Sequence, residues 1–271
     1  MATDPVQFAP TLTRALAAVL LVIATAACEE SPIEVPADAA ANEMIAAAAA
    51  AGAQTLDHRE LCDPREHEFT LQIDNDFFPM PVGRTWFLEG REENDEGEIV
   101  KLRLKITVLD RVERVAGVRT RVVEEKEWED GELIERSLNF FAQSEQGTLC
   151  YFGEEVFPAS IGGAWRADNP DSHAGIYFPA HPVVGMTFLQ EEAPNARDKS
   201  AILDLNRRVR TPYRVFRETL TARDCNQIEE PGCNPLTSDD EVKHYAEDVG
   251  IIVDGPVRLV HFLSGQGGLD D

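Results

Sequence analysis

The amino-acid sequence predicts an all-β protein, mainly antiparallel, in which a meander forms one large curved sheet, a half-barrel or a sandwich. At 100–108 every second residue is apolar and the residues between are polar, the pattern of a half-buried strand. Asp130-Gly131 is a strong two-residue hairpin signal between two further segments of strand character, 118–128 and 132–141. The long segments without turn residues are therefore interpreted as strands.

A stretch rich in proline and aromatic residues, Phe77–Gly90, returns about a hundred residues later. Aligned on Gly83 and Gly185, both copies have an aromatic-Phe-Pro start, a second proline and Val-Gly-x-Thr-aromatic. The prolines cannot continue a ladder, and the glycines permit a φ that other residues avoid. We therefore expect Pro79–Trp86 and Pro179–Phe188 to follow similar backbone paths, each ending in a strand.

Composition divides the chain into four parts. The parts expected are a signal peptide at 1–27, an Ala-rich tether at 28–55, a single β-rich domain at 56–264 built from two strand series at about 77–153 and 177–263, and a flexible tail at 265–271. Within the domain, the mixed periodicity of 201–209 leaves strand or short helix open, and 153–176 has the composition of a loop. Trp165 is expected to be a buried anchor on a short strand within that loop.

The N-terminal segment predicts export. Arg14 precedes an uncharged, mostly apolar run at 15–27, which is shorter than the ~20 residues of a membrane span and fits a signal peptide. Thr25-Ala-Ala-Cys28 resembles a bacterial lipobox, so Cys28 is the expected lipidation site, with ordinary signal-peptidase cleavage as the rival. Glu29 follows in place of a retention Asp, so the expected location is the outer membrane or periplasm, lipid-anchored, or alternatively the exterior after secretion.

The charge balance limits the partners. The chain has 49 acidic and 25 basic residues, a net charge of −24, which repels nucleic acid and attracts cations or basic partners. Acidity also serves solubility, which is the simpler explanation. The partners expected are a membrane through the lipid anchor and either an unknown envelope protein or a small apolar ligand, with no nucleic acid.

Four cysteines remain once Cys28 is set aside, and an exported chain meets an oxidising compartment. Cys225 and Cys233 flank a short polar loop and are expected to pair with each other. Cys62 is then expected to pair with Cys150, which ties the start of the domain to its fifth strand. Zinc binding is the alternative, but no Cys-x-x-Cys or His-x-x-x-His spacing supports it.

Motifs of several enzyme classes are absent, among them Gly-x-Ser-x-Gly, His-Glu-x-x-His, the Walker loop and the Rossmann glycine pattern. No catalytic residue and no cofactor are therefore predicted. Weak metal candidates lie on loops within a short stretch of chain, namely Asp168, Asp171, His173 and His181. A weaker cluster, His58, Cys62 and His67, loses its thiolate if the disulfide forms.

Two carboxylate pairs, Glu154-Glu155 and Glu191-Glu192, invite comparison with the acid/base pairs of glycosidases. Neighbours on a strand point to opposite faces, so neither pair is itself a catalytic dyad. Solvated surface charge is the interpretation favoured for both pairs. Large aromatic side chains suggest a different site, a concave apolar pocket lined by Trp86, Phe87, Trp128, Phe140, Phe141, Tyr151, Phe152 and Trp165, although most such residues form the core.

The opening Phe77-Phe-Pro-Met-Pro-Val-Gly-Arg-Thr-Trp86, the Asp130-Gly131 hairpin and Leu149-Cys-Tyr-Phe-Gly-Glu154 resemble a group of uncharacterised bacterial secreted proteins and lipoproteins. That group shares a Tyr/Phe-Phe-Pro-x-x-x-Gly-x-x-Trp opening and a final Gly-Ile/Leu-Val strand, here Gly250–Val253. The resemblance covers roughly 74–263. It implies an exported, strand-rich fold and assigns no catalytic residues.

Three functions follow from these observations. The leading hypothesis is a non-enzymatic envelope lipoprotein that binds a partner or small ligand outside the cytoplasm. The second is a carrier of lipid or another apolar ligand on a concave sheet face. The third is a metal-assisted secreted hydrolase built on loop carboxylates with His173 and His181.

Overall fold

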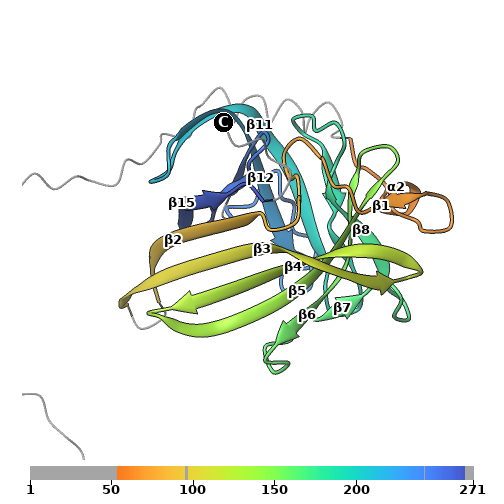
Figure 1. Cartoon of the computed structure of the whole chain (residues 1–271), viewed down its shortest axis with the longest axis horizontal. Coiled ribbons are helices and arrows are strands. Elements are labelled where there is room, and N and C mark those ends of the chain that lie inside the picture. The colour runs from red at the N-terminus through yellow and green to blue at the C-terminus, as the bar shows by residue number, and fades with distance from the viewer. Residues whose placement is uncertain (1–53, 95–96, 241, 266–271) are drawn as a thin grey trace, which may run out of the picture. The chain divides into compact units, whose positions relative to one another are not determined.

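The computed structural model describes residues 54–94, 97–240 and 242–265, all within the compact unit Ala37–Asp271, and the protein is all-β there (Figure 1). The predicted fold class is confirmed. The expected signal peptide, Cys28, most of the tether and the tail from residue 266 onward lie outside the described residues. No helix in the described part is long and apolar enough to cross a membrane.

The elements follow one another in a simple order. They are α2 His58–Leu61, β1 Phe69–Thr70, β2 Thr85–Glu93, β3 Ile99–Val115, β4 Val118–Glu129, β5 Glu132–Ser144, β6 Leu149–Phe157, β7 Trp165–Arg166, β8 His173–Phe178, β9 Thr187–Leu189, β10 Glu191–Glu192, β11 Asp198–Arg210, β12 Val215–Asn226, β13 Val242–Ala246, β14 Gly250–Asp254 and β15 Val257–Leu263.

The strands form an antiparallel meander that nearly closes on itself. Each strand from β2 to β6 pairs with the next, the same holds from β11 to β15, and β15 pairs with β2 to join the two series. At the far ends β9 pairs with β11 and β10 with β8. Because β9 and β10 are consecutive in the chain, the segment Thr187–Glu192 connects the two edges of the sheet. We call this segment the seam.

A glycine permits the seam to form. A Cβ atom on Gly175 of β8 would lie 2.0 Å from the carbonyl oxygen of Gln190 in the seam. That separation is far inside van der Waals contact, so a side chain at this position would push the two strands apart. Gly175 therefore allows the sheet to close.

The two copies of the repeated stretch have the same local structure, as predicted. Gly83 has φ 84° and Gly185 has φ 87°. The Gly83 amide donates to the carbonyl of Val108 at 2.9 Å, and the Gly185 amide donates to the carbonyl of Ile202 at 2.8 Å. In each copy the strand, β2 or β9, begins two residues after the glycine. The prediction of two similar backbone paths is confirmed.

The aromatic residues of the two copies meet in the core. Phe78 stacks on Trp86 with ring centroids 5.4 Å apart, and its ring lies 5.3 Å from that of Tyr177 in the second copy. Phe77 stacks on Phe178 at 6.1 Å. The repeated stretch therefore fills one end of the sheet's interior with the protein's own aromatic rings.

Two expectations about the middle of the chain are resolved by the sheet. The segment 201–209 is strand, within β11, because it pairs with β12. Trp165 is 2% exposed on the short strand β7, as predicted. The span 153–176 is less loop-like than its composition suggested, since β6 continues to Phe157 and β8 begins at His173.

Candidate ligand-binding site

The interior of the sheet carries a cluster of charged side chains beyond the aromatic end. On β4, Val123 is buried, and Glu125 and Glu127 follow it on the same, inward face. Glu124 lies on the outer face, where its carboxylate is 2.7 Å from both Lys126 Nζ and Arg136 Nε. Because side chains alternate along the strand, the carboxyl groups of Glu125 and Glu127 point toward the interior.

Other strands add carboxyl groups to the same region, and one lysine lies among them. We call this set the acidic layer: Glu125, Glu127, Glu135, Glu154, Glu191, Asp198, Asp224, Asp254 and Lys243. Eight carboxyl groups therefore face a single ammonium group. The layer carries a large excess of potential negative charge, and its side chains are half-buried.

Lys243 on β13 is held between two of these carboxylates. Its Nζ atom lies 3.3 Å from Asp224 Oδ2 and 3.5 Å from Asp254 Oδ1. Asp254 and then Asp224 raise the pKa of Lys243 well above its usual range, against the opposing effect of burial. Lys243 is therefore charged at neutral pH and neutralises part of the layer.

The remaining carboxyl groups are not neutralised by a partner. Burial, reinforced by the nearby Glu135, raises the pKa of Glu154 to about 7. Burial and then Glu127 raise the pKa of Glu125, and burial and then Asp198 raise that of Glu191, both well above the usual range. In each case burial and a neighbouring carboxyl group disfavour the ionised form.

Three tyrosines border the layer on its aromatic side. Tyr151, Tyr177 and Tyr245 are part of the aromatic core, and the rings of Tyr151 and Tyr177 meet edge to face at 5.7 Å. The Tyr151 hydroxyl donates to Asn139 Oδ1 at 2.5 Å. Aromatic faces beside carboxylates are the surroundings that organic cations favour.

A cleft gives access to the layer. It has a volume of about 390 Å³, and its lining includes Glu125 and Glu127 of β4, Lys243 of β13 and Asp254 of β14, together with Arg103 and Trp128 from the outer face. That volume lies within the range of small-molecule sites, about 300–1,000 Å³. Four members of the acidic layer thus line an open cleft.

Polar atoms deeper in the layer lack partners. Within the described residues no hydrogen-bond partner is present for Ser200 Oγ, Asp198 Oδ1 or Asp224 Oδ1, and all three atoms are buried. Ser200 is 1% exposed and lies opposite Asp224 in the β11–β12 pairing, so both side chains point to the interior. Buried polar atoms are normally hydrogen-bonded, so these three atoms retain unused hydrogen-bonding capacity.

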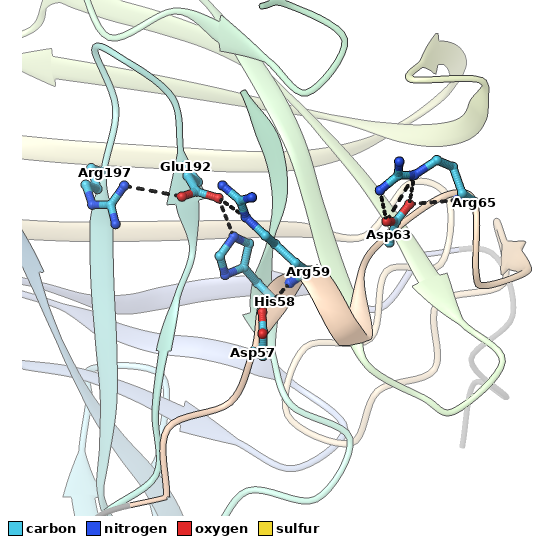
Figure 2. A network of polar contacts seen from close by, with 7 residues as sticks. All are labelled: Asp57, His58, Arg59, Asp63, Arg65, Glu192 and Arg197. Atoms are coloured by element: carbon cyan, nitrogen blue, oxygen red, sulfur yellow. Dashed lines mark hydrogen bonds and ion pairs between the residues drawn. The ribbon is translucent and has the colours of Figure 1, made fainter. Parts of the chain in front are cut away.

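A second polar network lies outside the sheet at the seam (Figure 2). Figure 2 shows His58 and Arg59 reaching from α2 to Glu192, with Arg197 on the other side of the same carboxylate. Glu192 Oε2 is 2.6 Å from His58 Nε2 and 2.9 Å from Arg59 Nε, and Oε1 is 3.4 Å from Arg197 Nη1.

Both oxygens of the Glu192 carboxylate have partners in this network. Burial opposes the ionisation of Glu192, but the hydrogen bonds from Arg59 and His58 outweigh it and lower the pKa to about 2. Asp63 is paired in the same way with Arg65, whose hydrogen bonds lower the pKa of Asp63 to about 2. Because Glu192 contacts His58 and Arg59 of α2, this network fastens α2 to the seam, and the carboxylates of Glu192 and Asp63 both have cationic partners.

The two carboxylate pairs are split across the sheet, as strand alternation predicted. Glu154 and Glu191 face the acidic layer, whereas Glu155 lies 3.5 Å from Arg166 and Glu192 belongs to the outer network. The interpretation of both pairs as solvated surface charge was wrong for Glu154 and Glu191. The nearly closed sheet makes their face an interior.

The weak metal candidates do not assemble. Asp168 pairs with Arg166 at 3.2 Å and accepts a hydrogen bond from the Ala116 amide, while His173 begins β8. Asp171 lies in the loop before that strand, and His181 is exposed. Within 54–94, 97–240 and 242–265, no group of three or more His, Cys, Asp or Glu side chains has the geometry to hold a metal ion.

The cysteines pair as expected from the sequence. Cys62 is bonded to Cys150 and Cys225 to Cys233. His67 does not join Cys62 in a ligand set, because its Nδ1 is 2.9 Å from Glu145 and its Nε2 contacts the carbonyl of Glu60. Two disulfides are compatible with an exported protein.

The aromatic residues proposed for a concave pocket are mostly core. Trp86, Phe140 and Phe152 are completely buried. Phe87 and Trp128 instead lie on the outer face, where Lys105 Nζ is 5.4 Å from the Phe87 ring and the Arg103 guanidinium is 5.5 Å from Trp128.

Comparisons with protein-family models, with curated proteins and with solved structures found no match to this chain.

Proposed function

We propose that the protein is a non-enzymatic envelope protein whose acidic layer binds a small organic cation. The observation that carries the proposal is the ratio of eight inward carboxyl groups to one lysine beside an open cleft of about 390 Å³. A cationic ligand would supply the charge that Lys243 alone does not. Its binding would favour the ionised form of carboxyl groups whose pKa is raised in the free protein.

Organic cations fit this layer better than the other ligand classes. A metal ion needs several oxygen or nitrogen ligands converging within about 2.0–2.6 Å, and the described residues contain no such group. An apolar ligand would meet carboxyl groups where it needs hydrocarbon, and the aromatic end is already filled by Phe78, Trp86 and Tyr177. An ammonium group can bind carboxylates with its N–H donors and rest against tyrosine rings.

The cell envelope is the proposed location. The apolar run before Cys28 supports export, and the lipobox-like Thr25-Ala-Ala-Cys28 supports a lipid anchor at the outer membrane. Formation of both disulfides also favours an oxidising compartment. Periplasmic amines and cationic peptides would be accessible to a binding protein held there.

The test uses residues 37–271, which contain every described strand, both disulfides and the main hydrophobic core. Putrescine, spermidine and tyramine are titrated calorimetrically, with palmitate and calcium chloride as the apolar and metal probes. We expect an amine to bind, and to bind more tightly as the pH rises from about 5 to about 8, because the layer then ionises. Binding of palmitate without binding of amines would identify an apolar carrier, and stabilisation by calcium alone a metal site.

A matched pair of variants locates the binding. Glu127→Gln removes one carboxylate of the cleft and keeps its shape, so amine affinity should fall about tenfold or more. Glu132→Gln, at the exposed end of the hairpin that follows β4, removes the same charge from the surface and should leave the affinity within about twofold. Equal effects of the two variants would show that binding follows net charge and does not occur in the acidic layer.

A further inference from the structure

The end of the β11–β12 hairpin is basic, whereas the chain as a whole is acidic. The eleven residues from Arg207 to Arg217 include five of the chain's 25 Lys and Arg residues. The nearest acidic residues along the chain are Asp204 and Glu218. In a chain of net charge −24, this segment is a concentrated basic surface.

The hairpin end is hydrogen-bonded to β15. The Tyr213 amide donates to the carbonyl of Leu259 on β15 at 3.0 Å. Arg258, also on β15, donates to the carbonyl of Arg210 at 3.4 Å. These contacts bring Arg258 beside the hairpin. We call Arg207–Arg217 together with Arg258 the arginine hairpin.

Most of these arginines are not used inside the protein. Arg207 lies 4.0 Å from Asp204, but none of the described carboxylates forms an ion pair with Arg208, Arg210 or Arg217, all of which are exposed. Elsewhere on the surface, arginines such as Arg136 and Arg166 are paired with glutamates. Guanidinium groups of Arg208, Arg210 and Arg217 exposed at one hairpin form a surface that attracts anions.

Exposed apolar groups lie between the arginines. The Tyr213 side chain is 41% exposed and Val215 is 39% exposed. The Arg214 guanidinium stacks over the Phe216 ring at 4.5 Å, which leaves its N–H edges free to point outward. Guanidinium groups beside a tyrosine and an aliphatic side chain are the mixture that binds the headgroup region of a bilayer.

We propose that the arginine hairpin docks the body onto a bilayer surface that carries anionic phosphate headgroups. Such a surface repels the body as a whole, because the chain carries −24, so binding must use the region where positive charge is gathered. Arginine binds phosphate oxygens through paired N–H donors, and a membrane offers many such groups in one plane. The hairpin would fix which side of the body faces the membrane and leave the acidic layer for its ligand. The proposal does not depend on what that layer binds.

The test again uses residues 37–271, which exclude Cys28 and its expected lipid. The protein is sedimented with vesicles of phosphatidylcholine alone or mixed with phosphatidylglycerol, over a range of salt concentrations. We expect binding only to the mixed vesicles, decreasing as salt is added, because the attraction is electrostatic. Equal binding to both kinds of vesicle, or no binding to either, would overturn the proposal.

Matched variants separate the hairpin from net charge. The triple substitution Arg208→Gln, Arg210→Gln and Arg217→Gln should weaken vesicle binding about 100-fold, since each basic residue near an anionic surface contributes about fivefold. The control substitutes Gln for Lys101, Arg91 and Arg119, exposed residues elsewhere on the sheet, and removes the same charge. An equal loss in the control would refute the assignment to the hairpin.

Folding and self-association are checked on the same samples. Both triple variants should keep the wild-type melting temperature, because the substituted side chains are exposed. If the wild-type protein self-associates without vesicles and only the hairpin variant abolishes this, the surface binds a second copy of this chain. That result would also overturn the proposal.

Discussion

Replacing Glu154 with glutamine should make the protein more stable at neutral and alkaline pH. Glu154 lies in the acidic layer, where burial and then Glu135 raise its pKa from 4.5 to about 7. The folded protein therefore holds this proton more tightly than the unfolded chain does. The contribution of this proton to the free energy of unfolding is fully present below the unfolded pKa of 4.5. It is lost as the pH rises through the folded pKa of about 7.

The size of the stability change follows from the pKa shift of Glu154. The pKa of Glu154 rises from 4.5 to about 7. At about 1.4 kcal/mol for each pKa unit, the wild-type protein loses about 3 kcal/mol of unfolding free energy between acidic and alkaline pH through this one group. Glutamine keeps the volume of the neutral side chain and never ionises, so Glu154→Gln should not show this loss.

Urea unfolding followed by tryptophan fluorescence measures the difference, since Trp86 and Trp165 are both buried in the core. At about pH 5 the variant and the wild type should agree to within about 1 kcal/mol, whereas at about pH 8 the variant should be more stable by about 2–3 kcal/mol. Glu192 does not obscure the comparison, because its pKa of about 2 lies below this range. A variant that is less stable than the wild type at about pH 8 would refute the claim that burial among other carboxyl groups raises the pKa of Glu154.

Two further predictions concern how the sheet is held together. Removing the Cys62–Cys150 disulfide, whose cysteines are 88 residues apart, should lower the unfolding free energy by about 4–5 kcal/mol. Removing Cys225–Cys233, separated by 8 residues, should lower it by about 2–3 kcal/mol. Urea titrations of the two double-alanine variants measure both losses, and a larger loss for the Cys225–Cys233 variant would contradict the prediction. Gly175→Ala should separate β8 from the seam, lower stability by about 1–3 kcal/mol and speed amide exchange at 187–192. Gly131→Asn, at a turn where a Cβ would meet nothing within 4 Å, is its control, and equal exchange in the two variants would argue against closure at the seam.

Local patterns were enough to predict the strands and the repeated stretch. Gly83 and Gly185 each require positive φ, and a strand must begin soon after each, so both copies fold alike whatever lies around them. The disulfide between Cys225 and Cys233 follows from a similarly local constraint. These features depend on a few adjacent residues.

The acidic layer depends on pairing between distant strands, which no local pattern records. At 124–129 nearly every residue is charged, so alternation cannot tell which carboxyl groups face inward. Glu154 and Glu191 become interior groups only because β10 joins β8 while β9 joins β11. A signal was nevertheless present at Gly175, since a glycine inside a strand often marks a close approach of another backbone.

The position of the acidic layer follows from the repeated stretch. Both copies turn their aromatic rings into the same end of the interior, where Phe78 and Tyr177 meet, so the remaining space lies at the other end. Hydrophobic side chains would fill that end with greater stability, because unpaired carboxyl groups raise one another's pKa and oppose burial. A fold that keeps such groups around an open cleft departs from the rule that buried charges are paired, and departures of this kind concentrate at functional sites. The same carboxyl groups that weaken the free protein would stabilise it once a cation is bound, and this links its stability to its proposed ligand.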